Sequence, residues 1–511
     1  MLFANRIPTV NFWEWIKEDR ENRRLLWWSA AVSALVFTIF KLFYPFPNFM
    51  PPDSYSYLEA AYNNQAINMW AIGYSKFLRA VSCFVKADLG LVIIQYVLLQ
   101  ASLLYFLFTL KYLLGPSTRS FRILLGLNLL NPLVPHISNF VSSDALFAAL
   151  SLGWFTQLLW IIKGKPSRNL LIMHAFVLLG AFMVRYNGLY YPIFSIVAIF
   201  FAHLRSRLKA LAIGLIVLLI GFFVGRTMQV YYKETKTWQY SAFGGWQIAS
   251  NALYGYAYAE NDPPEKVPAE FRALHVFVNS HMDSIRRLAL RPDNDVAIYY
   301  LWDFKSPLKL YMESQTKKDT ATKNYFHRWA KMGSLYASYG RWLVKEHPLL
   351  FLHYYAWPNF IKYYAPPAGF MGSYVLGNDK VDFIAARWFG WKKDKVYNNF
   401  KDKKIQVSEL FPTVLAITNL VFVGVFLAFA GLGGWRQSLP LTRYILWCTL
   451  SVWIVNMGFS VIAAPIELRY QIFSLLITFG FMWVLINWVI IQAWIRQPEK
   501  HTIAELPTNL Q

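Results

Sequence analysis

The sequence predicts an all-α polytopic membrane protein with about ten transmembrane helices and an outer soluble domain of α or α+β structure. Of the 511 residues, 56% are hydrophobic and only 15% are charged, a balance that soluble globular domains rarely show. The formal charge of +22 comes from Lys and Arg that cluster beside apolar stretches. This placement is typical of cytoplasmic loops and argues against nucleic-acid binding.

Ten apolar stretches approach the roughly 20 residues needed to cross a bilayer. They cover residues 26–44, 89–114, 121–135, 141–162, 170–184, 189–202, 211–231, 410–432, 444–464 and 472–495. The stretches 121–135 and 189–202 are short, so the pattern defines the number of spans only to within one or two.

Every second loop is rich in Lys and Arg, which predicts that these loops and both termini lie in the cytoplasm. The polar segment between the seventh and eighth spans has the size of an independent domain. The predicted organisation is a cytoplasmic interfacial helix (1–25), an N-terminal transmembrane module (26–231), an extracytoplasmic domain (232–409), C-terminal transmembrane helices (410–495) and a cytoplasmic tail (496–511).

The first predicted outer loop, residues 45–88, contains an acidic residue directly after the first span. Asp53 follows two prolines and precedes Tyr55 and Tyr57. Behind it, residues 74–85 place apolar side chains at helical spacing, which predicts a helix lying in the interface. A carboxylate at this level could act on a lipid headgroup, although Asp53 also fits the position of a helix N-cap.

Further charged residues mark other span ends on the same predicted face. Asp144 begins the fourth span, Arg185 follows the fifth, and Glu467 and Arg469 begin the last. Each has a structural alternative: Asp144 could cap its helix together with two serines, the arginines could anchor the interface, and Arg469 could simply pair with Glu467. The one ionisable residue deep in a span, His174, is predicted to be a hydrogen-bonded core residue.

Taken together, these features resemble the GT-C superfamily of integral membrane glycosyltransferases, with the aminoarabinose transferases and protein O-mannosyltransferases as the nearest types. The resemblance covers residues 26–230 and 410–489. It is carried by the acidic first outer loop, by the large segment after the seventh span and by three motifs: Ser142-Ser143-Asp144-Ala145-Leu146-Phe147, Arg185-Tyr186-Asn187-Gly188 and Glu467-Leu468-Arg469-Tyr470.

The resemblance implies transfer of a sugar from a polyprenyl-phosphate donor to a lipid, glycan or protein acceptor, on the extracytoplasmic face of a bacterial inner membrane. It implies Asp53 as the base that accepts the proton of the acceptor hydroxyl, with Asp144 as a second catalytic carboxylate. Arg469 and Arg185 would bind the donor phosphate. The substrate contacts would include Tyr55, Tyr57, Glu467 and Tyr470. The sequence shows no cluster of metal ligands, and the resemblance leaves open whether a divalent metal is a cofactor.

Two other classes of protein have a similar number of spans. A transporter or flippase of lipid-linked glycans usually has ionisable groups or broken helices near the midplane, whereas the charges here stop at the span ends. A non-catalytic membrane assembly protein would need no carboxylate at the headgroup level. Replacing Asp53 would separate that alternative from an enzyme.

Overall fold

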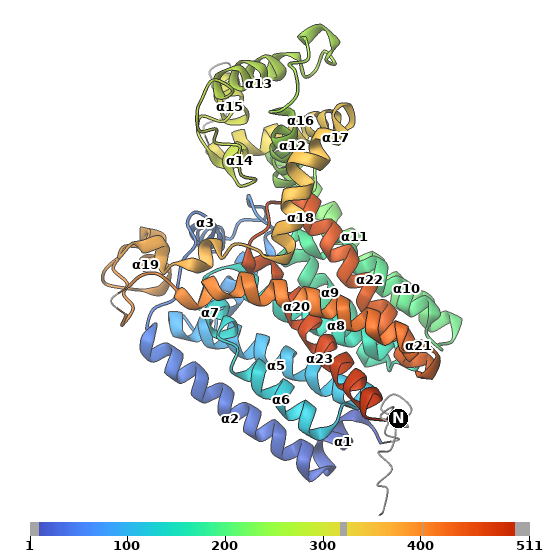
Figure 1. Ribbon diagram of the computed structural model, residues 1–511. Helices are drawn as coiled ribbons and strands as arrows, with labels where there is room; N and C mark the ends of the chain where they lie inside the picture. Colours follow the sequence, from blue (N-terminus) through green and yellow to red (C-terminus); the bar gives the residue numbers. More distant parts are fainter. Residues whose placement is uncertain (1–9, 317–323, 401, 496–511) are drawn as a thin grey trace, which may run out of the picture.

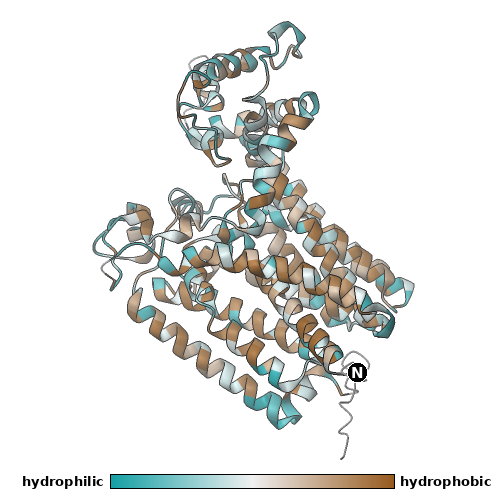
Figure 2. Cartoon of the chain, in the orientation of Figure 1, coloured by the Kyte–Doolittle hydropathy of each residue, from teal (hydrophilic) through white to brown (hydrophobic). Residues whose placement is uncertain are grey.

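The computed structural model describes residues 10–316, 324–400 and 402–495. Within these ranges the chain is mainly helical and forms no β-strand, only isolated bridges. The helices form an apolar bundle, and a more polar lobe stands on one end of it (Figure 1, Figure 2). The helical class predicted from the sequence is confirmed, and the apolar bundle is what a membrane protein requires.

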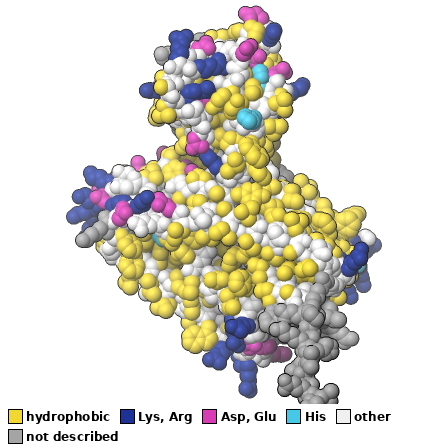
Figure 3. All heavy atoms as spheres, in the orientation of Figure 1, with side chains coloured by type: hydrophobic (Ala, Val, Ile, Leu, Met, Phe, Trp, Pro, Cys, Tyr) yellow, Lys and Arg dark blue, Asp and Glu magenta, His cyan; other side chains and the backbone are white. Residues whose placement is uncertain are grey.

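Among the described residues, seven helices are long and apolar enough to cross a membrane. They are α2 (Arg20–Phe43), α5 (Asp88–Leu114), α8 (Ser143–Ile162), α11 (Ser206–Thr235), α20 (Gln406–Gly431), α22 (Pro440–Ala463) and α23 (Ile472–Ile495), which the turn η6 (Leu468–Gln471) precedes. Each coincides with a predicted span. Hydrophobic side chains cover much of the bundle surface in Figure 3, and Lys and Arg gather at its ends.

The other three predicted spans are shorter helices. α9 (Arg168–Val184) and the continuous pair η1 (Tyr186–Tyr190) and α10 (Tyr191–Phe201) are apolar but shorter than 18 residues. α6 (Thr118–Leu129) has 12 residues and rises only about 18 Å. The predicted span 121–135 was too long because its apolar pattern runs on into α7 (Leu133–Ser138). α7 begins after Pro132 and is a separate helix.

The centre of the bundle is formed around α8, whose side chains are mostly buried. Trp154 stacks on Tyr191 with ring centroids 3.8 Å apart, and its indole N–H donates to Ser195 Oγ at 2.9 Å. His174 Nε2 lies 2.9 Å from the same hydroxyl, and His174 Nδ1 lies 3.3 Å from Gln157 Oε1. His174 is therefore the hydrogen-bonded core histidine that the sequence predicted.

The lobe contains helices from the middle of the chain (Figure 1). They are α12 (Ala242–Tyr256), α13 (Arg272–Ile285), α14 (Tyr299–Trp302), α15 (Pro307–Thr316), α16 (Tyr325–Glu346) and α17 (Pro348–Phe351). α12 and α16 touch backbone to backbone: a Cβ on Gly245 would lie 1.8 Å from the carbonyl oxygen of Gly333, and one on Gly340 would lie 2.6 Å from Ala249 N. These glycines allow the two helices to form a close-packed base for the lobe.

After the lobe, the chain returns to the end of the bundle through α18 (Trp357–Tyr364) and α19 (Phe383–Phe389), and α19 packs beside α3 (Asp53–Tyr62). Asn48, in the loop before α3, holds this return segment: its Oδ1 accepts from Val375 N at 2.7 Å and its Nδ2 donates to Ser373 O at 3.2 Å. The predicted segment 232–409 thus divides between the lobe and the return segment. α4 (Gly73–Ser82) and α1 (Phe12–Glu18) lie where the sequence predicted interfacial helices.

Candidate functional site

Backbone pairing brings the starts of α3 and α8 together. Asn48 N donates to Asn139 O at 2.8 Å, and Val141 N donates to Asn48 O at 2.9 Å. Asp53 is the first residue of α3, and Asp144 is the second residue of α8. Two carboxylates that lie 91 positions apart in the sequence therefore belong to one site.

A buried amide positions the third part of the site. Asn359 Nδ2 on α18 donates to the carbonyl oxygens of Val461 and Ala464, each at 2.7 Å, and its Oδ1 accepts from Ile466 N at 2.9 Å. These bonds satisfy the free carbonyls at the end of α22. They also fix the turn that leads into η6, and the next residues along the chain carry the remaining charged groups of the site.

Arg469 is the centre of the charged cluster and is only 8% exposed. Its Nη1 lies 2.9 Å from Asp53 Oδ2, its Nε lies 2.9 Å from Glu467 Oε2, and its Nη2 donates to the Tyr470 hydroxyl at 2.7 Å. A third carboxylate, Asp144, approaches to 3.9 Å. The guanidinium thus uses all three nitrogens on neighbouring oxygens, as expected for a buried arginine.

Arg185 completes the cluster from the other side. It lies between α9 and η1, forms an ion pair with Asp144, and places its guanidinium 4.7 Å from the centre of the Tyr470 ring. Three carboxylates face two guanidinium groups. The cluster is nearly balanced in charge, which allows it to remain buried.

Burial raises the pKa of the Asp53 carboxyl above its ordinary value, and the Arg469 guanidinium acts against this rise. The pKa of Glu467 is raised for the same reason and is opposed by the same arginine. Desolvation makes each carboxylate a better proton acceptor, whereas the ion pair keeps it charged. Asp53 is thus suited to accept a proton once its arginine is engaged elsewhere.

The structure decides against helix capping as the role of these aspartates. Pro52 is the N-cap of α3 and Ser142 is the N-cap of α8, and neither helix has a side-chain capping bond. Asp53 and Asp144 form ion pairs with arginines instead. Arg469 does pair with Glu467, as the structural alternative supposed, but this is one of several polar contacts that it makes.

The two predicted tyrosines of the first loop lie in the same region. The Tyr57 hydroxyl is 3.2 Å from Ser143 Oγ, so it joins α3 to α8 beside the charged cluster. Tyr55 stacks on Phe49 with centroids 5.8 Å apart. Both tyrosines line the cavity described next. All eight predicted site residues thus line one region, and six of them contact one another directly through ion pairs, hydrogen bonds or ring contacts.

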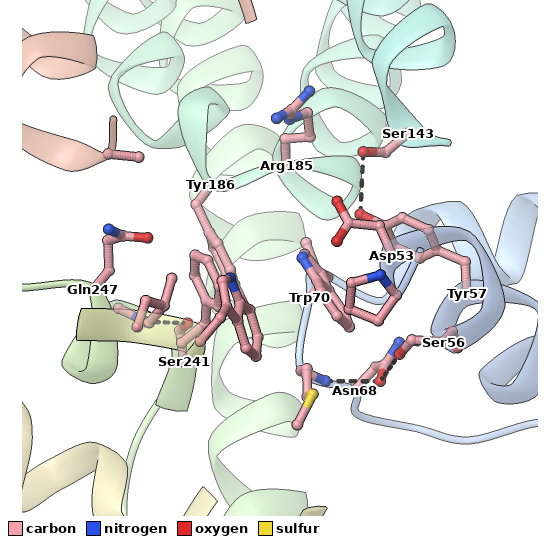
Figure 4. Close-up of a pocket in the computed structure, with 18 of the residues that line it drawn as sticks. Asp53, Ser56, Tyr57, Asn68, Trp70, Ser143, Arg185, Tyr186, Ser241 and Gln247 are labelled. Carbon is pink, nitrogen blue, oxygen red and sulfur yellow. Dashed lines mark hydrogen bonds between the residues drawn. The ribbon is translucent and has the colours of Figure 1, made fainter. Parts of the chain in front are cut away.

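The cluster opens into a cavity of about 1950 Å³ that reaches from the end of the bundle into the lobe. Figure 4 shows Asp53, Arg185 and Tyr57 on one side, and Tyr186, Ser241 and Gln247 on another. Several aromatic rings line it, including Trp70, Phe243, Trp302 and Phe326. Typical ligand cavities measure about 300–1,000 Å³, so this one has room for more than one ligand of ordinary size.

The described residues contain no group of three or more His, Cys, Asp or Glu side chains that could hold a metal ion. The three carboxylates of the charged cluster, Asp53, Asp144 and Glu467, are already bonded to guanidinium groups. Divalent metals such as Mg²⁺ and Ca²⁺ bind carboxylate, carbonyl and water oxygens. A divalent metal at this cluster would have to compete with the two guanidinium groups for the carboxylates.

Sequence reasoning missed the part of the cavity that lies in the lobe. Trp302 and Lys309 come from the segment 232–409, and Trp70 from the turn after α3. No local pattern marked them, because they meet only through the packing of the lobe on the bundle. Phe370, whose ring centre lies 4.9 Å from the Arg469 guanidinium, was missed for the same reason.

No protein-family model, no curated protein and no solved structure matches this chain. The likeness to GT-C glycosyltransferases therefore depends on the short motifs and on their order along the chain.

Proposed function

We propose that this protein is a membrane glycosyltransferase of the GT-C type that moves a sugar from a polyprenyl-phosphate donor to a lipid, glycan or protein acceptor. One observation carries the proposal. A half-buried carboxylate, Asp53, and a buried guanidinium, Arg469, lie 2.9 Å apart on the wall of a large cavity at the end of an apolar bundle. A proton acceptor and a phosphate-binding group side by side are what this transfer needs.

In the proposed reaction the acceptor oxygen attacks the anomeric carbon of the sugar. A carbon–oxygen bond forms there as the bond to the phosphate oxygen breaks, and the leaving phosphate keeps the electron pair. Asp53 takes the proton of the acceptor hydroxyl. Arg469 and Arg185 stabilise the charge that grows on the phosphate.

The resting ion pair has a consequence for this mechanism. When a donor phosphate binds Arg469, the guanidinium is shared between the phosphate and Asp53, and its hold on the carboxylate weakens. The pKa of Asp53 then rises further, because the opposing charge is partly neutralised. Donor binding would thus activate the base, and Glu467 would keep the arginine oriented throughout.

The proposal includes a location. The three shorter helices α6, α9 and α10 would complete ten crossings, and the loops rich in Lys and Arg would lie in the cytoplasm. The lobe and the cavity would then face the extracytoplasmic side of a bacterial inner membrane. Nucleotide sugars are absent there, which fits a lipid-linked donor.

The proposal is tested by donor cleavage. The purified chain is placed in lipid nanodiscs with polyprenyl-phosphate donors carrying a hexose, an N-acetylhexosamine or an aminopentose, with and without a bacterial envelope extract as the source of acceptor. Formation of free polyprenyl phosphate is followed by mass spectrometry. We expect it from at least one donor, and more of it with the extract.

This readout requires no knowledge of the acceptor, because every version of the reaction releases the same lipid phosphate. Donors that stay intact but cross the bilayer of a sealed vesicle would identify a flippase and refute transfer. Donors that neither react nor move in the presence of well-folded protein would also refute it.

A further inference from the structure

Lys309, on α15, is a buried cation that the proposed reaction does not use. Its side chain lines the same cavity as Asp53, but at the lobe end. The residue is only 2% exposed. Lysine is rarely buried to this degree unless it is paired.

Aromatic rings, not carboxylates, surround the ammonium group. Lys309 Nζ lies 4.8 Å from the centre of the Trp246 ring, 5.1 Å from that of Trp302 and 5.2 Å from that of Tyr325, and it donates to the Tyr325 hydroxyl. In the described part of the chain no carboxylate forms a salt bridge with it. Glu313, one turn along α15, pairs with Arg328 at 3.3 Å.

This arrangement is incomplete by itself. An ammonium group has three N–H donors, and the described residues provide one hydrogen-bond acceptor. Cation–π contacts offset only part of the cost of burying an unpaired charge. Burial lowers the pKa of Lys309 to about 8, with Glu313 acting in the opposite direction, so the group is still mostly charged at neutral pH.

The other ionisable groups on this wall do not supply the missing charge. Glu234 also lines the cavity, but its Oε2 lies 2.9 Å from His327 Nε2, and both side chains are partly open to solvent. An anion that enters the cavity would therefore find Lys309 as the buried cation with donors to spare, within reach of flat aromatic faces.

We infer that Lys309 forms a second anion-binding subsite at the lobe end of the cavity, which takes a phosphate or carboxylate group of the acceptor. The assignment to the acceptor rests on the proposed function, in which Arg469 and Arg185 bind the donor phosphate. The two cationic ends of one cavity would then hold the two substrates. Trp70 and Trp302, stacked at 5.8 Å on the wall between them, offer a surface for a sugar ring.

The subsite is tested by binding, without transfer. Isothermal titration calorimetry on the full chain in neutral detergent is carried out with inorganic phosphate, with acetate and with dihexanoyl phosphatidic acid, and dihexanoyl phosphatidylcholine is the uncharged control lipid. The variants are Lys309→Met, which keeps the length and the apolar stem, Lys309→Arg, which keeps the charge, and Lys305→Met, which removes an exposed lysine of the same lobe.

We expect Lys309→Met to weaken binding of the phosphate probes by about ten-fold or more, since a hydrogen bond to a charged group contributes about 1.5–3 kcal/mol. Lys309→Arg should retain most of the affinity, and Lys305→Met should match wild type. Tighter binding of phosphatidic acid than of phosphate would identify a lipid headgroup as the source of the anion, and the reverse order would identify a free phosphoryl group.

The inference is overturned if folded Lys309→Met binds every probe as tightly as wild type, or if wild type binds none of the anions. A loss of stability in Lys309→Met with unchanged binding would assign Lys309 to packing, which also overturns it. None of these results depends on donor cleavage, so the subsite and the transferase activity can fail separately.

Discussion

The two ends of the cavity surround their cations with different partners. At the bundle end, Arg469 and Arg185 lie among carboxylates of this same chain. At the lobe end, Lys309 lies among aromatic rings with a tyrosine hydroxyl as its polar contact. The first arrangement is stable without a ligand, and the second is completed only by one.

The difference shows how one cavity can treat two substrates differently. A ligand at the bundle end must compete with Asp53 and Glu467 for the arginine, so binding there alters the protonation of the carboxylates. A ligand at the lobe end competes with no carboxylate and alters no base. We therefore expect substitutions at the bundle end to change stability and chemistry, and those at the lobe end to change affinity alone.

The largest expected contrast is in stability. Arg469→Ala leaves the half-buried Asp53 and Glu467 without their cation, which should lower the free energy of unfolding by about 3 kcal/mol. Lys309→Met replaces a lone buried cation by an apolar side chain, which should change it by less than about 1 kcal/mol in either direction. Chemical unfolding in mixed micelles measures both, with exposed Arg436→Ala as control. Equal losses in the two variants would remove the distinction between the two ends.

The second contrast is in pH dependence. Asp53 must be ionised to accept a proton, and burial raises its pKa above 3.8, so activity should be lost as the pH falls through that raised value. Arg469→Gln removes the charge that opposes the rise, and the acidic limb should move up by about 1–3 pH units. Lys309→Met should leave it in place. The readouts are the pH profile of donor cleavage and the infrared carbonyl band of protonated Asp53. If the acidic limb stays in place in Arg469→Gln, the Arg469 guanidinium does not control the pKa of Asp53.

A smaller effect is expected at Gly369, which supports the bundle end. Its φ is +54°, and a Cβ there would lie 2.8 Å from the carboxyl carbon of Glu467. Gly369→Ala should cost about 1–3 kcal/mol in stability and weaken donor binding by displacing Glu467. Gly372→Ala is the matched control, because the nearest atom to its Cβ would be 3.6 Å away. If both variants behave alike in thermal unfolding and donor titration, Glu467 does not need its present position.

The sequence was sufficient to single out charged residues that lie together at the bundle end of the cavity. Charges at span ends are rare enough in an apolar chain that Asp53, Asp144, Arg185 and Arg469 could be identified singly. Their direct pairing could not be predicted, because it depends on the bridge at Asn48 and on the hydrogen bonds of Asn359, two ordinary asparagines in the sequence.

The lobe end could not be predicted, for a related reason. In a polar segment, a lysine or a tryptophan is unremarkable until tertiary packing buries it. Lys309 and Trp246 come from two helices, α15 and α12, that meet only in the folded lobe. Helix lengths were likewise overestimated where an apolar pattern continued through prolines, as at residues 121–135.

The most direct test of the central claim is the single-turnover rate of polyprenyl phosphate release by Asp53→Asn, compared with Glu59→Gln. Both residues belong to α3, but Glu59 is exposed and forms no ion pair among the described residues. Asn nearly matches Asp in volume and cannot accept the proton. We predict a rate lower by roughly 100-fold or more for Asp53→Asn, with donor still bound, and a rate near wild type for Glu59→Gln. A well-folded Asp53→Asn protein that releases polyprenyl phosphate as fast as wild type would contradict the account.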